Sequence, residues 1–127
     1  MSIQKATEAL ARHPDIKLAI VFGSVASGQA RPDSDIDIAV QADRPLTTRQ
    51  TMRLIEDVAM ATGRPVDLID LARVGEPLLG EIVRHGQRIL GSNHDLAELR
   101  LRHVYLNEDF MPYVRRMLDE RNRAWLR

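Results

Sequence analysis

The fold of this chain is decided by the stretch GSVASGQARPDSDID, residues 23–37. Apolar runs at 16–22 and 36–40 flank and overlap it, and both are typical of buried strands. The small-residue loop between them delivers two acids, Asp35 and Asp37, at the start of the second strand. Residues i and i+2 of a strand point to the same face, so two like charges lie side by side. A proton or a cation must resolve that conflict, and Mg²⁺, which prefers carboxylate and phosphate oxygens, is the cation expected.

The composition is that of a globular protein of one domain. The 127 residues are 44% apolar and 28% charged, and the lack of cysteine excludes disulfides and thiolate metal sites. The formal net charge is zero, from 18 basic and 18 acidic residues, so no overall basic field favours direct nucleic-acid binding. The first residues do not resemble a signal peptide, and no apolar stretch approaches the ~18 residues of a membrane span. We therefore expect a cytoplasmic protein without membrane association.

Short apolar runs alternating with helical patterns predict an α/β (α+β) fold, with a small mixed β-sheet, flanking helices and a helical tail. Strands are expected at 16–22, 36–41, 65–71 and 88–90, and helices at 3–12, 47–62, 76–86 and from 92 onward. Thr47 and Gln50 predict a capping box, and Gly63 predicts the end of that helix. Residues 1–91 are expected to form the core, and residues 92–127 a C-terminal helical extension packed on it.

The loop and a third acid supply the residue types of a phosphate and metal site. Gly23 lets a backbone approach a phosphate, and Ser24 offers a hydroxyl and a backbone N–H. A tight turn alone would explain that pair, and a solvated turn alone would explain Asp35 and Asp37. Asp67 argues against both, because it lies in an apolar run where an unpaired carboxylate is costly. If the second and third strands are neighbours, Asp67 completes a three-carboxylate cluster suited to two-metal phosphoryl or nucleotidyl transfer.

Structural roles are expected for several other polar and apolar residues. Asp70 points to the face opposite to that of Asp67, which predicts a strand-end cap. The four histidines show no metal-ligand spacing. Pro112 should kink or split the tail helix. The tail also carries an apolar stripe in steps of three and four residues, which is expected to pack on the core; a partner contact through Phe110, Tyr113 and Trp125 is the alternative. The stripe consists of Leu96, Leu99, His103, Leu106, Phe110, Tyr113 and Met117.

The spacing from Gly23-Ser24 to Asp35-x-Asp37 resembles the signature of the DNA polymerase beta superfamily of nucleotidyltransferases. Further positions are similar to its small MNT branch, the minimal nucleotidyltransferases. These positions are Ala26, Gly28, Arg31 and Asp33-Ser34. The resemblance covers residues 16–71 and is looser beyond them. It implies a polymerase-beta-like nucleotidyltransferase fold.

The resemblance also implies how a nucleotide would bind. Ser24 and the Gly23 backbone would hold the β- and γ-phosphates of ATP. Many members carry arginine where this chain has Ser27, and Arg31 could supply the missing positive charge. Asp35 and Asp37 would bind Mg²⁺.

The same resemblance implies the reaction and its partner. Asp67 would join a second Mg²⁺ and help deprotonate an acceptor hydroxyl, which attacks the α-phosphate as pyrophosphate leaves. Many MNT proteins are antitoxins of a HEPN-type ribonuclease toxin in type VII-like pairs, with transfer of AMP from ATP to a toxin tyrosine as the precedent. The alternatives are a non-catalytic antitoxin that neutralises its toxin by binding, and a small-molecule nucleotidyltransferase of the aminoglycoside-modifying kind.

Overall fold

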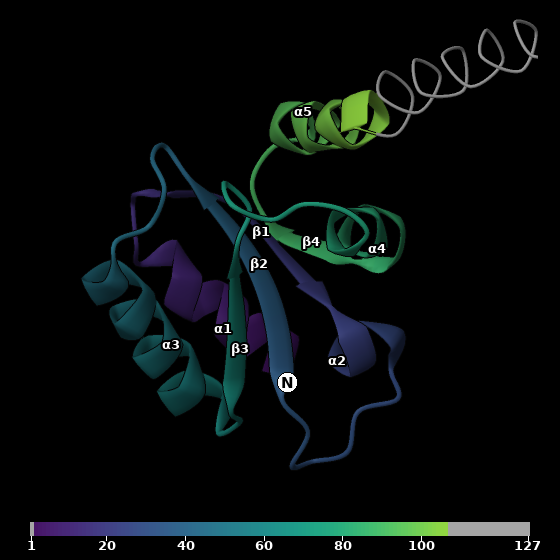
Figure 1. Ribbon diagram of the computed structural model, residues 1–127. Coiled ribbons are helices and arrows are strands. Elements are labelled where there is room, and N and C mark those ends of the chain that lie inside the picture. The colour runs from purple at the N-terminus through teal and green to yellow at the C-terminus, as the bar shows by residue number, and fades with distance from the viewer. Residues whose placement is uncertain (1, 107–127) are drawn as a thin grey trace, which may run out of the picture.

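A four-stranded mixed sheet lies between two groups of helices in the computed structural model, which describes residues 2–106. Figure 1 shows the elements in place. In chain order they are α1 (Ser2–Ala11), β1 (Ile16–Phe22), α2 (Gly23–Ser27), β2 (Ile36–Ala42), α3 (Thr48–Thr62), β3 (Val66–Asp70), α4 (Leu78–His85), β4 (Gln87–Leu90) and α5 (Asn93–Val104). The predicted α/β class with a mixed sheet and flanking helices is confirmed.

The strand order is β3-β2-β1-β4, with β2 and β1 in the middle. β1 pairs antiparallel with both β2 and β4, whereas β2 and β3 are parallel. The parallel pair requires a crossover, and α3 supplies it. The second and third strands are therefore neighbours, as the predicted three-carboxylate cluster requires.

Both faces of the sheet are covered, which explains why β1 and β2 are almost continuously apolar. On one face, Ile36, Ile38 and Val40 of β2 pack with buried residues of α1 and α3, including Leu10 and Leu54. The helices α4 and α5 cover the other face (Figure 1). Its core consists of Leu18, Ile20, Ala39, Leu71, Leu79, Ile82 and Leu99.

Local capping signals set the bounds of α3. The Gln50 backbone N–H donates to Thr47 Oγ1 at 3.1 Å, and the Thr47 N–H donates to Gln50 Oε1 at 2.9 Å. The helix ends at Gly63, whose φ of 69° is left-handed and favours glycine. The predicted capping box and helix stop are both confirmed.

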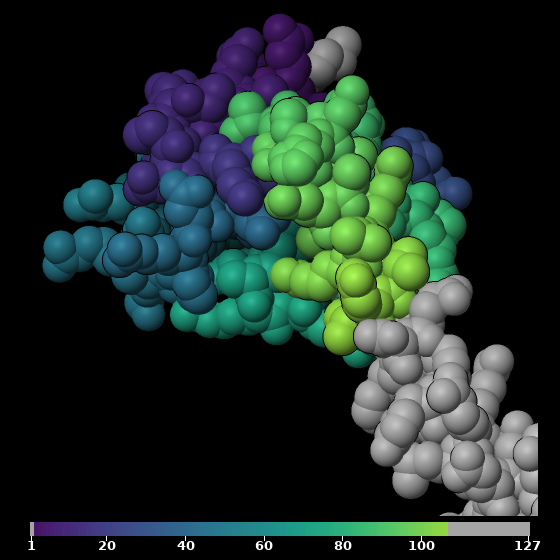
Figure 2. Space-filling model, turned by 90° about the horizontal axis from the view of Figure 1, so that it is seen from above, coloured from purple at the N-terminus to yellow at the C-terminus, as the bar shows by residue number. Residues whose placement is uncertain are grey.

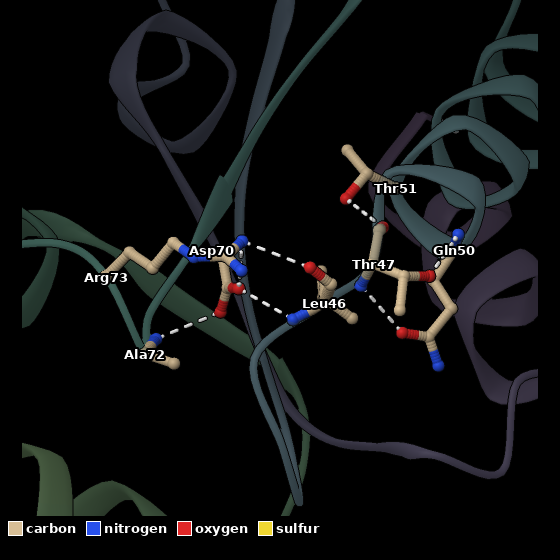
Figure 3. Close-up of polar contacts among 7 residues, drawn as sticks. All are labelled: Leu46, Thr47, Gln50, Thr51, Asp70, Ala72 and Arg73. Carbon is tan, nitrogen blue, oxygen red and sulfur yellow. Dashed lines mark hydrogen bonds and ion pairs between the residues drawn. The ribbon is translucent and has the colours of Figure 1, made fainter.

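Asp70 closes the far end of β3, as predicted (Figure 3). Its carboxylate accepts hydrogen bonds from the backbone N–H of Leu46 at 2.9 Å and of Ala72 at 3.0 Å. Arg73 donates to the same carboxylate at 3.3 Å and to the Leu46 carbonyl at 3.0 Å. These bonds join the β2–α3 connection to the end of β3, so the two parallel strands are held together beyond their ladder.

The first part of the C-terminal extension packs on the rest of the protein. A capping box of Ser92 and Asp95 begins α5, and the segment from β4 into α5 fills the middle of the face seen in Figure 2. Arg102 donates to the Val74 carbonyl at 3.2 Å, and His103 Nδ1 lies 2.5 Å from Glu76 Oε1. Both contacts hold the last turns of α5 against the segment between β3 and α4.

The predicted stripe is only partly confirmed. Leu99 is buried and Leu96 packs beside it, but Leu106 is 44% exposed, so its predicted packing on the core is wrong. Leu106 follows the end of α5, and its neighbours Val104 and Tyr105 are exposed as well, so this part of the chain lies away from the core. The remaining predictions for the tail, at Phe110, Pro112, Tyr113, Met117 and Trp125, lie outside the described residues. The division at residue 91 stays a prediction. None of the described helices is long and apolar enough to cross a membrane.

Candidate active site

The loop that leaves β1 forms one short helix and is shaped by two glycines. Gly23 begins α2 with φ 70°, and Gly28 ends it with φ 77°. The Ser24 carbonyl accepts hydrogen bonds from the Gln29 N–H at 3.0 Å and from Ser27 Oγ at 3.1 Å. Ser27, where the resemblance expects arginine, thus helps to close the loop. The Ser24 hydroxyl makes no hydrogen bond within residues 2–106, so it is available to a ligand.

Gly23 lies directly against the Asp37 side chain. The residue before it, Phe22, is the register partner of Asp37 in the β1–β2 ladder. A Cβ atom at position 23 would collide with Asp37 Oδ2 and lie 3.2 Å from its Cγ. Glycine is therefore required here by space as well as by its positive φ. The close approach places the loop backbone beside the carboxylate.

The three predicted acids come together at the start of the parallel strand pair. Asp37 and Asp67 are register partners of β2 and β3, and Asp35 lies one residue before β2. Partial burial raises the pKa of Asp37 above its ordinary value of 3.8, and the negative charges of Asp67 and then Asp35 raise it further. A side-chain hydrogen bond with Asp67 acts in the same direction. The cluster therefore favours a proton or a cation.

The predicted apolar surroundings of Asp67 are wrong. Asp67 is the exposed position of β3, not a carboxylate enclosed by apolar residues. The reason is that β3 is an edge strand with β2 as its one neighbour in the sheet, so its surface remains open to water. What singles out Asp67 is its register with Asp37, and not the cost of burying it.

The acids fit the donor chemistry of Mg²⁺ without forming a complete cage. Within residues 2–106, no group of three or more His, Cys, Asp or Glu side chains is already arranged to hold a metal ion. Mg²⁺ is usually held by one or two carboxylates, with water and substrate phosphates completing its shell. The pair Asp37 and Asp67, with Asp35 beside it, supplies those carboxylates. Partial burial and then the negative charges of Asp67 and Asp35 raise the pKa of Asp37, and a bound cation would offset those charges.

Arg64, which was not predicted as a site residue, binds the motif loop from outside. Arg31 lies on an exposed turn, Arg31–Ser34, and its guanidinium makes no hydrogen bond or ion pair within the described part of the chain. Arg64 Nη1 donates to the Arg31 carbonyl at 2.6 Å and to the Ser34 carbonyl at 3.1 Å. No sequence pattern marks this contact, because its acceptors are backbone carbonyls about thirty residues earlier.

The sheet order, the helical layers and the loop beside β2 define a nucleotidyltransferase fold. The family model described as polymerase beta, nucleotidyltransferase matches residues 4–95. This chain therefore belongs to the polymerase beta nucleotidyltransferase family.

Individual relatives agree with the family match. The protein adenylyltransferase MntA of Shewanella oneidensis is 34% identical over 82 residues, which are 65% of this chain and 59% of that relative's length. A crystallised toxin–antitoxin complex with AMP-PNP contains a chain 26% identical, with a TM-score of 0.79, and the match covers 94% of this chain and 98% of that one. A chain of an MntA–HepT complex, 24% identical, has the same fold, with a TM-score of 0.71 over 94% of this chain and 95% of that one.

Proposed function

We propose that this protein is a Mg²⁺-dependent nucleotidyltransferase that acts as an antitoxin, transferring AMP from ATP to a hydroxyl, most simply a tyrosine hydroxyl, of a HEPN-type toxin. The observation that carries the proposal is the cluster of Asp35, Asp37 and Asp67 beside the Gly23 loop, where partial burial and the charges of the other two acids raise the pKa of Asp37. The adenylyltransferase activity named for MntA and the toxin–antitoxin complex with AMP-PNP support it.

The chain's own groups divide the work between binding and proton transfer. The Ser24 hydroxyl and the backbone at Gly23 hold the terminal phosphates, and Arg31 approaches the triphosphate from its exposed turn. When bound, Mg²⁺ supplies positive charge that offsets the triphosphate and the carboxylates. Asp35 and Asp37 provide oxygen ligands. Asp67, open to solvent on the edge strand, accepts the proton of the incoming hydroxyl.

The exposure of the site suits a protein acceptor. Asp67 is exposed, and so are Arg31 and Asp35. An acceptor tyrosine on another protein can therefore approach the acids from outside the sheet edge, with the partner excluding water as it docks. This places the partner in the role that a second substrate domain plays in larger enzymes.

The test is label transfer from α-labelled ATP, in the presence of Mg²⁺, to a HEPN-type toxin. The protein and toxin are mixed as purified full-length chains, and the modified residue is mapped by mass spectrometry. We expect a labelled tyrosine with the wild-type chain, none in EDTA, and none with the double variant Asp35→Asn and Asp37→Asn. Asp33→Asn, which removes an exposed acid of the same loop, is the matched control and should keep transfer.

Two results would count against the proposal. Absence of label with a folded wild-type chain and its toxin removes the catalytic role. Full protection of cells by the double variant, with no modified toxin, instead supports an antitoxin that acts by binding alone.

A further inference from the structure

Arg64 connects three separate parts of the chain. It follows the helix-ending Gly63 and precedes β3 by one residue, Pro65. Its Nε donates to Ser2 Oγ at 2.9 Å, at the start of α1. Its Nη1 donates to the carbonyls of Arg31 and Ser34, at 2.6 and 3.1 Å. The side chain is half-buried, so these contacts are only partly shared with water.

The turn that Arg64 holds also has bonds of its own. The Arg31 N–H donates to Ser34 Oγ at 2.8 Å, and the Ser34 N–H donates to the Arg31 carbonyl at 3.0 Å. These bonds close the turn without Arg64. These two bonds do not connect the turn to β3. The turn is connected to β3 by the Arg64 guanidinium and, just after the turn, by the hydrogen bond from the Ile36 N–H to the Pro65 carbonyl at 2.9 Å.

The position of the turn matters because of its neighbours in the chain. Asp35 directly follows Ser34, and Asp67 follows Arg64 by three residues. Arg64 therefore adds a second link, beside the β2–β3 pairing that begins at Ile36, between the segment that carries Asp35 and the strand that carries Asp67. Since the guanidinium fork is planar and presents several donors in a rigid arrangement, it can hold two carbonyls at once.

We propose that Arg64 is a positioning residue of the active site, which sets Arg31 and Asp35 relative to Asp67 through the carbonyls of the Arg31–Ser34 turn. The inference rests on the proposed nucleotidyl transfer. Arg64 is outside both hydrophobic cores, so its removal should affect the site more than the fold. Geometry of this kind is costly to lose, because displacing a reacting group by about 1 Å can lower a rate about 100-fold.

The experiment compares Arg64→Ala and Arg64→Lys with two controls. Ser2→Ala removes the partner of Nε and leaves both turn carbonyls bound. Arg49→Ala removes the same charge from an exposed position of α3. For each full-length protein, kcat and KM for ATP are measured separately with the toxin. Hydrogen exchange of residues 29–36 is followed in the protein alone.

Arg64→Ala should lower kcat/KM by about 100-fold, mainly in kcat, and speed exchange in residues 29–36 but not in β1. Arg64→Lys should recover part of kcat/KM and part of the protection from exchange, because an ammonium group donates to carbonyls but lacks the planar fork. Both controls should stay within about twofold of wild type. If Arg64→Ala does not fold, Arg64→Lys serves as the test. A kcat/KM and an exchange rate equal to those of the wild type in Arg64→Lys would overturn the proposal.

The exchange measurement separates this inference from the proposed function. A wild-type protein that transfers no label contradicts the function, while faster exchange in residues 29–36 of Arg64→Ala still supports the anchoring of the turn. Transfer that is normal in Arg64→Ala, with exchange unchanged, contradicts the inference and leaves the function standing.

Discussion

Replacing Asp37 by asparagine should stabilise the protein when no metal is present. The carboxylate is partly buried and repelled by Asp67 and Asp35, which raises its pKa. The amide keeps the shape of the side chain and removes the charge. Because Asp37 is only partly buried, solvent screening limits the gain in unfolding free energy to roughly 0.5 kcal/mol. For a chain of this size that is about 2 °C in Tm.

The pH dependence follows from the direction of the shift. Below the ordinary aspartate pKa of 3.8, Asp37 is protonated in both the folded and the unfolded chain, so this repulsion contributes nothing to the difference in stability. As pH rises through the raised folded-state pKa, the folded wild-type protein must lose its proton against the field of the other acids. The wild type therefore loses stability relative to Asp37→Asn, and the gap is complete by neutral pH.

The assay is thermal unfolding of both proteins across this pH range, with and without Mg²⁺ and a non-hydrolysable ATP analogue. A ligand that binds only the folded state at 100 times its Kd adds about 2.7 kcal/mol, so the wild type should overtake the variant when both are added. Asp33→Asn is the control, and its Tm should match that of the wild type both with and without the ligands. A variant that is less stable than wild type at neutral pH without metal would refute the reasoning about charge repulsion.

Three further predictions concern the loop and two helix caps. Gly23→Ala should lower the free energy of unfolding by about 1–2 kcal/mol, because residue 23 has a left-handed φ. It should also abolish transfer, because the new Cβ displaces Asp37. Retained activity would contradict this contact. Thr47→Ala should lower the free energy of unfolding in urea by about 1 kcal/mol without changing transfer, since the cap lies at the far end of β2; an unchanged midpoint would argue against the capping box. Hydrogen bonds from the Ser92 backbone N–H and then from its hydroxyl lower the pKa of Asp95, so its stabilising effect is present above pH 3.8 and lost as pH falls. NMR titration should find a pKa closer to 3.8 in Ser92→Ala, which loses the hydroxyl bond and keeps the backbone one; an unchanged pKa would exclude a contribution from the hydroxyl.

The elements that could be predicted from the sequence are those specified by neighbouring residues. The apolar runs gave β1 its bounds, and the Thr47–Gln50 box with Gly63 gave α3 both ends. Each of these depends on residues that are close in sequence, where spacing alone constrains geometry.

Other features depended on contacts between distant residues. The register of Asp37 with Asp67 requires a parallel pair joined by a crossover, which the sequence analysis could only set as a condition. The exposure of Asp67 depends on β3 lying at the edge, a property of the whole sheet. Arg64 was missed because its acceptors are carbonyl groups, which every residue carries. Contacts between distant residues therefore determine the features that local sequence patterns could not predict.

Because β3 lies at the edge of the sheet, Asp67 also affects the solubility of the protein. An edge strand presents unpaired backbone groups that can add a strand from another molecule, and a charged side chain on the strand discourages this. The other positions of β3 include Val66, Leu68 and Ile69. Replacing Asp67 by valine to test its chemistry would leave an apolar edge open to aggregation. Asp67→Glu keeps the charge on the edge strand while moving the carboxylate, so this variant, checked by light scattering, separates loss of reaction from loss of this protection.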